Sequence, residues 1–194
     1  AARCKNARAT LIERSGFMLN FAHKSVNHPL NTALRDRIEI LEADVSLTGK
    51  ARASAGLIDN SFDYVIMNPP FNEASDRSTP DPLKAEAHVM PEGMFEQWLR
   101  TASALLRPGG GVSIIARPAS LAPILEALER RFGGLKIIPI LPRPDAAAIR
   151  IVITGIRGSR AGLSLMPALI LHGDAGNDFT PRATAINNGQ TSLL

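Results

Sequence analysis

Short apolar runs that alternate with helix-like segments place the strongest limit on how this chain can fold. Residues 9–13, 37–45 and 62–67 have the length and the apolar content of buried strands. Segments of helical periodicity lie between or after them, as at residues 15–28. Because parallel strands are connected by such crossover helices, the pattern predicts an α/β fold with helices on both faces of a mostly parallel sheet.

The second half of the chain continues the alternation. Five further elements are expected, in the order helix, strand, helix, strand, strand, at residues 91–106, 107–117, 120–134, 135–142 and 146–158. A glycine turn is expected at the start of the first of these strands, and Gly133 and Gly134 are expected to close the second helix. A short turn joins the last two strands, which predicts an antiparallel pair. Pro139 confines its strand to an edge or a bulge, because proline has no backbone N–H.

The organisation of the chain favours a single domain over residues 1–194, since there is no internal repeat and no linker-like segment. Residues 72–90 are polar with little periodicity, and long loops of this kind commonly act as lids or binding loops. The polar tail after about residue 175 is expected to be mobile.

Composition argues against several classes of protein. No apolar stretch approaches the roughly 20 residues of a membrane-spanning helix, and the first ten residues lack the apolar core of a secretory leader. Cys4 is the one cysteine, so no internal disulfide is expected and a reducing compartment, the cytoplasm, is favoured. The formal net charge of +4 permits a polyanionic partner. The basic residues are scattered, however, which slightly favours a solvated surface over a binding face.

Polar side chains stand at the ends of three predicted strands: Glu13, Asp44 and Asn68. Ligands of an open α/β sheet bind beyond the carboxyl ends of its strands. An ionised carboxylate only accepts hydrogen bonds, which suits the two hydroxyls of a ribose or the amine of an adenine. Either acid could instead be a helix N-cap or a solvated loop residue. Their recurrence at successive strand ends favours a cofactor that contains a nucleoside.

The strand at residues 62–67 is followed by the tetrapeptide Asn68-Pro69-Pro70-Phe71. A residue before proline is held extended and proline has no N–H, so this backbone is stiff and presents bare carbonyl oxygens. The Asn68 side-chain oxygen and a proline carbonyl could accept both protons of a planar –NH2 group and direct its lone pair at an electrophile. Phe71 offers a flat face on which the ring bearing that amine could stack. The alternative is a rigid turn with Phe71 in the core.

The tetrapeptide NPPF, with EADV before it at residues 42–45 and LRPGGG after it at residues 106–111, resembles the class I S-adenosylmethionine-dependent methyltransferases that methylate amines. The similarity is greatest to the bacterial tRNA1(Val) adenine-N6 methyltransferase-like family, through AEAHVM at residues 85–90 and GSR at residues 158–160. The resemblance extends over essentially the whole sequence. It implies a Rossmann-like methyltransferase fold, S-adenosyl-L-methionine as cofactor, and methyl transfer to adenine N6 of an RNA partner, tRNA.

The resemblance also implies a role for each site residue. Glu13 would bind the cofactor ribose and Asp44 the adenine amine, with Val45 lining the adenine pocket. Asn68 would lie against the cofactor as well as the substrate. The target base would be held by the four motif residues, Asn68, Pro69, Pro70 and Phe71. The methyl group would be transferred by an in-line displacement at the sulfonium.

One part of the family pattern is missing from the sequence. The glycine-rich loop of the family follows a strand that precedes the one ending at Glu13, and neither feature is present. The PGGG at residues 108–111 is no substitute, because it does not open a helix. The chain is therefore expected to be N-terminally incomplete, without the first strand of the fold.

Other functions stay open from the sequence. The same motif could serve guanine N2 of rRNA or a protein glutamine amide. In a different class, the chain could be a catalytically silent, methyltransferase-like RNA-binding module. A hydroxyl-methylating enzyme is disfavoured, because it would want a general base or a metal ion where NPPF stands.

Four residues are candidates for substrate contacts: Arg77, His88, Arg117 and Arg143. They fall in the long loop or near strand ends, where they could contact tRNA phosphates, although a solvated surface explains them as well. No metal site is expected, because the histidines lack the spacing of metal ligands. The edge formed by the C-terminal antiparallel pair could serve a homodimer.

Overall fold

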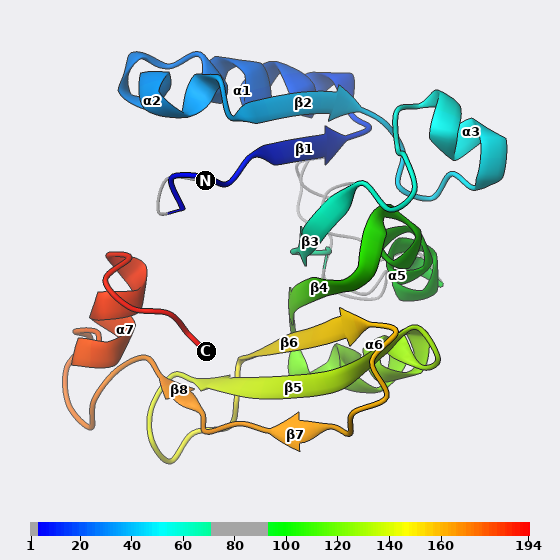
Figure 1. Cartoon of the computed structure of the whole chain (residues 1–194). Coiled ribbons are helices and arrows are strands. Elements are labelled where there is room, and N and C mark those ends of the chain that lie inside the picture. Colours follow the sequence, from blue (N-terminus) through cyan, green and yellow to red (C-terminus); the bar gives the residue numbers. More distant parts are fainter. Residues whose placement is uncertain (1–3, 71–92) are drawn as a thin grey trace, which may run out of the picture. The chain divides into compact units, whose positions relative to one another are not determined.

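The computed structural model describes residues 4–70 and 93–194, which fold into two compact units, Ala1–Asp59 and Asn60–Leu194 (Figure 1). The first unit has a two-stranded sheet and the second a six-stranded sheet. Among the described residues, no helix is long and apolar enough to cross a membrane.

The first unit is built on a parallel strand pair with helices connecting and following it. Its elements are β1 Ala9–Glu13, α1 Gly16–Val26, a 3-10 turn at Pro29–Asn31, α2 Thr32–Arg35, β2 Ile38–Glu42 and α3 Gly49–Ser54. The two strands pair in parallel along their whole length, ending with Glu13 beside Glu42. The Ser15 hydroxyl accepts a hydrogen bond from the backbone N–H of Met18 and caps α1, while Leu19 of α1 is buried. The predicted strand–helix–strand order is confirmed here.

The second unit is built on a mixed sheet, in which three of the four long strands run in the same direction. Its elements are β3 Phe62–Met67, α5 Met94–Leu105, β4 Leu106–Ala116, a 3-10 turn at Pro118–Ser120, α6 Leu121–Leu128, β5 Phe132–Leu141, β6 Arg150–Arg157, β7 Ser164–Leu165, β8 Leu169–Ile170 and α7 Pro181–Asn187. The strand order is β3-β4-β6-β5-β7, with β8 also paired to β5. β3 and β4 are parallel, and β6 is antiparallel to both of its neighbours, β4 and β5. The carboxyl ends of β3, β4 and β5 therefore meet at one edge of this sheet.

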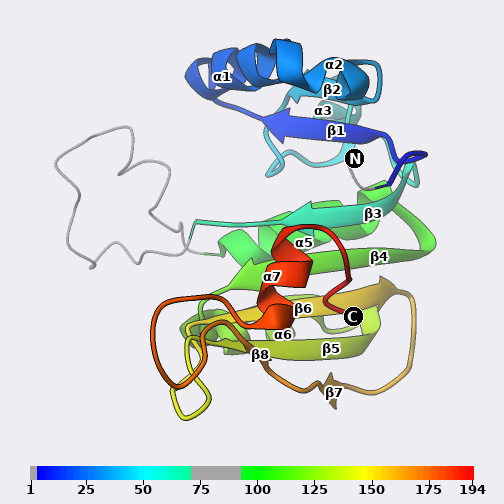
Figure 2. The ribbon, with the colours of Figure 1, turned by 90° about the vertical axis from the view of Figure 1, so that its left-hand side faces the viewer.

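Helices cover both faces of this sheet (Figure 2). α5 and α6 pack on one face around a core whose most deeply buried members include Leu99, Ile114, Ile124, Leu128 and Ile153. α7 covers part of the other face, where Ala183 is buried with Ile140 and Leu169. The α/β fold with a mostly parallel sheet and a C-terminal antiparallel pair is confirmed.

The glycine-rich segment before the fourth predicted strand is part of that strand. β4 begins at Leu106 and includes the three glycines, where the sequence predicts a turn. The pairing with β3 shifts its register between Phe62 and Tyr64, and Gly109 has a φ of +79°. The segment is therefore an irregular stretch of strand, which glycine allows at low steric cost.

The glycines expected to end α6 lie elsewhere. α6 ends at Leu128, and Arg130 takes the left-handed conformation with a φ of 64°. Gly133 and Gly134 lie inside β5, so the prediction that they close the helix is wrong. Gly133 is needed for close approach, because a Cβ there would lie 2.2 Å from the carbonyl oxygen of Ser159.

We expect Gly133→Ala to lower the free energy of unfolding by about 1–3 kcal/mol. The colliding atom belongs to the backbone, so relief requires a backbone segment to move rather than a side chain to turn. Urea denaturation measures the loss. Gly162→Ala is the matched control, since nothing lies within 4 Å of a Cβ at that position; equal losses in the two variants would contradict the explanation.

Pro139 lies in β5 where the outer side of the strand has no partner. β7 pairs with β5 at Lys136 and Ile137, and β8 pairs with it at Ile140 and Leu141. Pro139 falls between these two short pairings, as its missing N–H requires. The helix α7 is not anticipated by the sequence, which suggests only a polar tail there.

Candidate functional site

Glu13 and Asp44 lie at the carboxyl ends of the neighbouring strands β1 and β2 in the first unit. Glu13 is the last residue of β1, and its carbonyl oxygen accepts a hydrogen bond of 3.1 Å from the N–H of Ala43. Asp44 follows Ala43 directly, and both acids are half-buried. The structure therefore brings these two predicted residues together, through the register of the parallel pair. Val45 is half-buried beside Asp44 in sequence.

The backbone of the following loop orients each carboxylate. The Oε1 of Glu13 accepts the N–H of Ser15 at 2.8 Å, and the Oδ1 of Asp44 accepts the N–H of Ser46 at 2.7 Å. Each bond joins two residues that are two positions apart in the sequence. Each acid therefore also stabilises the loop that follows it, as expected if the acids were loop residues. Each bond leaves the second carboxylate oxygen for another donor, and on Asp44 the Arg14 guanidinium lies 3.9 Å from that oxygen.

The environment of Asp44 favours its ionised form. The hydrogen bond from the backbone N–H of Ser46 lowers the pKa of Asp44, and the Ser46 hydroxyl and the Arg14 guanidinium lower it further, against the opposing effect of partial burial. Asp44 is therefore a carboxylate at neutral pH, able to accept a hydrogen bond from an amine or a hydroxyl.

The motif that follows β3 lies in the second unit. Met67 ends β3 and is buried opposite Ile114 of β4. Asn68 is exposed, Pro69 is buried and Pro70 is half-buried. Within residues 4–70 and 93–194, the Asn68 amide has no hydrogen-bonding partner. Phe71 lies outside the described residues.

The predicted substrate-contact residues fall into two groups. Arg77 and His88 lie outside the described residues. Arg117 directly follows β4 and Arg143 follows β5, so both stand at the same edge of the sheet as Asn68. Arg143 donates to the carbonyl oxygens of Gly173 and Gly176, both at 2.7 Å. Its guanidinium is thus engaged within the chain.

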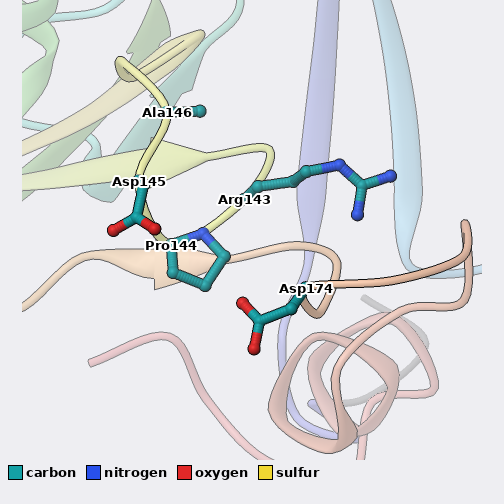
Figure 3. A pocket seen from close by; sticks show the side chains of 5 residues that line it. All are labelled: Arg143, Pro144, Asp145, Ala146 and Asp174. Atoms are coloured by element: carbon teal, nitrogen blue, oxygen red, sulfur yellow. The ribbon is translucent and has the colours of Figure 1, made fainter.

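An open cavity of about 470 Å³ lies beside Arg143 (Figure 3). It is lined by Arg143, Pro144, Asp145, Ala146 and Asp174. Sequence reasoning missed both acids, because they stand 29 positions apart and only the tertiary fold brings their loops together. In the described part of the chain, there is no group of three or more His, Cys, Asp or Glu side chains that could hold a metal ion.

Comparison with solved structures shows that this chain is similar to a protein of high sequence identity. The crystal structure of a predicted O-methyltransferase from Agrobacterium tumefaciens is 44% identical, with a TM-score of 0.86, and the match covers 100% of this chain and 83% of that one. No family model and no curated protein matches the sequence.

Two more distant structures share the fold alone. A tRNA methyltransferase from Aquifex aeolicus is 12% identical over 78% of this chain and 54% of that one, with a TM-score of 0.51. A SAM-dependent O-methyltransferase from Thermotoga maritima is 13% identical over 80% of this chain and 52% of that one, also with a TM-score of 0.51.

Proposed function

Since this chain belongs to the class I S-adenosylmethionine-dependent methyltransferases, the family of its Agrobacterium relative, we propose that it methylates an exocyclic amine, adenine N6 in tRNA. The observation that carries the proposal is the sequence Asn68-Pro69-Pro70 directly after β3, with an exposed asparagine before two stiff residues. Such a site offers hydrogen-bond acceptors and no side chain that titrates.

The donor set of the first unit fits the cofactor. S-adenosylmethionine presents hydroxyls on its ribose and an amine on its adenine, and both are hydrogen-bond donors that two carboxylates can accept. Glu13 and Asp44 lie at adjacent strand ends, each with one oxygen already fixed by the backbone. We assign Glu13 to the ribose, Asp44 to the adenine amine and Val45 to the wall of the adenine pocket.

The role proposed for this chain in the reaction is to orient the target amine. When bound, S-adenosylmethionine supplies an electrophilic methyl group on a positively charged sulfur. The Asn68 side-chain oxygen and a proline carbonyl would accept the two protons of the target amine and so direct its lone pair along the line of attack. No general base of high pKa is needed, because the amine proton becomes acidic only as the new N–C bond forms. Phe71, through its sequence position, is assigned to stacking on the base.

Methylation of a hydroxyl is the second candidate, because the similar Agrobacterium protein is described as a predicted O-methyltransferase. A hydroxyl must lose its proton to become a good nucleophile, which calls for a general base or a metal ion. Residues 68–70 supply neither, and this favours the amine.

The test is a product analysis. The protein is incubated with methyl-labelled S-adenosylmethionine and, separately, unmodified bacterial tRNA, rRNA and a protein mixture, and the products are digested and identified by mass spectrometry. N6-methyladenosine from tRNA supports the proposal. N2-methylguanosine or methylglutamine would move the activity to another amine, and a ribose or other O-methyl product would overturn amine methylation. RNA binding without any transfer would support the silent-module alternative.

Asp44→Asn is expected to weaken the binding of S-adenosylhomocysteine about tenfold, as measured by calorimetry, because a charge-assisted hydrogen bond to the adenine amine becomes a neutral one. Glu42→Gln is the control: it removes one carboxylate from the end of β2, two residues before Asp44, at an exposed position. Equal affinities in the wild type and Asp44→Asn would remove Asp44 from the cofactor site.

The direction of the pKa shift of Asp44 determines how this group affects folding stability and cofactor binding as the pH changes. The pKa of Asp44 is lower in the folded chain than the roughly 3.9 of an unfolded aspartate. The ionised group therefore stabilises the folded state above about pH 4, and this contribution is lost as the pH falls through the folded-state pKa. Asp44 stays ionised between pH 5 and 8, so it contributes no change in cofactor affinity over that range.

A further inference from the structure

The end of β4 and the start of β6 bring two arginines together. These strands run side by side in opposite directions (Figure 1) and pair Ala116 with Ile151, so one step further along the register Arg117 stands directly opposite Arg150. Arg117 has an extended backbone, with φ −76° and ψ 150°, and the line of the strand therefore continues to it. The two arginines are far apart in the sequence, and only the pairing of the strands makes them neighbours.

Both arginines lie on the face of the sheet that α7 partly covers. Side chains of a strand alternate between its two faces, so Arg117 shares a face with Ile115, and Arg150 shares one with Val152. Ile115 and Val152 pack against the buried cluster beneath α7. Both arginines are half-buried at the margin of this apolar face. They therefore share one face of the sheet as well as one register position.

The neighbours of this pair across the sheet give it no negative charge. On its other side, Arg150 is paired with Ile140 of β5, so its cross-strand neighbours are an arginine and an aliphatic residue. Like charges directly opposite each other in a sheet are destabilising, and an anion between them relieves the repulsion. Both arginines also have contacts within the chain, such as the 2.8 Å bond from Arg150 to the carbonyl oxygen of Ile149. A guanidinium has five donors, so it can keep such contacts and hold an anion as well.

The arginine pair stands beside the strand end that carries the motif. β3 and β4 are parallel neighbours that pair Met67 with Ile114, so Asn68 and Arg117 follow adjacent strands at the same edge of the sheet. Arg150 begins β6 at this edge, because β6 is antiparallel to β4. At about 4.8 Å between neighbouring strands, β4 and β6 lie roughly 5 and 10 Å from β3. A nucleotide whose base is held at Asn68 therefore has phosphates close to both arginines.

We infer that Arg117 and Arg150 form a phosphate clamp, in which both guanidinium groups hold one phosphate of the RNA strand next to the methylated nucleotide. The inference rests on the proposed activity toward RNA. The planar fork of a guanidinium matches the oxygens of a phosphate, and an ammonium group does not reproduce this geometry. The clamp reads no base: it fixes the position of the strand, while the motif that begins at Asn68 holds the target base.

The test measures the binding of unmodified bacterial tRNA to Arg117→Ala, Arg150→Ala, the double variant and Arg160→Ala. Arg160 is exposed and follows β6, whose carboxyl end lies at the opposite edge of the sheet, so its removal is a matched loss of one charge. We expect each single clamp variant to weaken binding about tenfold and Arg160→Ala to leave it within twofold. Arg117→Lys and Arg150→Lys keep the charge without the fork and should weaken binding about threefold. An unchanged affinity for S-adenosylhomocysteine in each variant shows that it is folded.

The salt dependence of binding counts the phosphates that the protein contacts. The slope of log Kd against log salt falls by about 0.7 to 0.9 for each phosphate contact that is lost. The double variant should lose one such step, because both arginines hold the same phosphate. A loss of two steps would overturn the shared clamp in favour of two separate contacts. An unchanged slope would overturn phosphate binding by either arginine.

A second measurement needs no RNA. Inorganic phosphate replaces chloride at constant ionic strength while the temperature of thermal unfolding is recorded. A ligand that binds only the folded chain raises this temperature, so phosphate should raise it by about 2 °C more in the wild type and in Arg160→Ala than in the double variant. Equal responses of the wild type and the double variant would overturn the anion site, whatever the substrate.

Failure of the clamp and failure of the proposed function are distinguishable. If the wild type methylates no RNA, but binding of tRNA and of phosphate depends on the two arginines, the clamp stands and the proposed function falls. If only the phosphate response depends on them, RNA is overturned as the ligand of the anion site. If the wild type methylates tRNA and the double variant binds it with wild-type affinity, the clamp falls and the function stands.

Discussion

Replacement of Asn68 by alanine is expected to lower kcat for methyl transfer by about 10²–10³-fold, the loss typical of removing one preorganised polar group from a reacting centre. The exposed Asn68 amide has no partner in the described part of the chain, so the variant should fold normally. What disappears is the acceptor that orients the amine. Single-turnover transfer from labelled S-adenosylmethionine measures the effect, and calorimetry with S-adenosylhomocysteine should show affinity within about threefold of the wild type.

Two variants serve as controls for this loss. Asn68→Asp keeps an acceptor oxygen in the same place and should retain far more activity than Asn68→Ala. Asn187→Ala removes an exposed asparagine at the end of α7 and should behave as the wild type. If Asn68→Ala transfers methyl groups at a rate within threefold of the wild type, the motif does not orient the amine and the amine-methylating proposal loses its main support.

Leu128→Ala is expected to have the largest effect on stability, about 2–5 kcal/mol of unfolding free energy. Leu128 is completely buried at the end of α6, in the core between the helices and the sheet of the second unit. Truncation removes apolar contacts and leaves a cavity, because the surrounding side chains are held by the helices and the sheet and do not collapse into the space. Trp98 is the one tryptophan and packs against the same core, so its fluorescence during urea unfolding reports on this unit.

The matched control for Leu128→Ala is Leu165→Ala. Leu165 is 74% exposed in β7, and its truncation should change the free energy of unfolding by less than about 0.5 kcal/mol. Losses of similar size in the two variants would mean that burial at Leu128 does not determine its contribution.

The strands of the sheet could be predicted because residues close to them in the sequence determine where they end. The run at residues 62–67 is followed by Asn68 and then by two prolines, and the structure ends β3 at Met67. The adjacency of Glu13 and Asp44 follows from a parallel pairing that a crossover helix makes almost obligatory. Such features depend on residue type and order alone.

The features that escaped prediction depend on contacts between distant segments. α7 has only a few apolar residues, so its own helix propensity does not explain why it forms. It is stabilised by the burial of Ala183 against β8 and β5. The acceptors that Arg143 engages at residues 173 and 176 are backbone carbonyls, which every residue carries, so no side-chain pattern announces them. Gly133 likewise meets the backbone of residue 159 only after two strands have paired.

The unpaired position at Pro139 affects whether a second copy of this chain could pair with the outer side of β5. An exposed strand edge offers a neighbouring chain a row of free N–H and C=O groups, and a long straight row promotes aggregation. Here the outer side of β5 is occupied by two pairings of two residues each, and the position between them has no N–H to offer. A second molecule that approached this side of β5 would therefore find only short, interrupted backbone to pair with, and the protein is protected there against growth of the sheet from molecule to molecule.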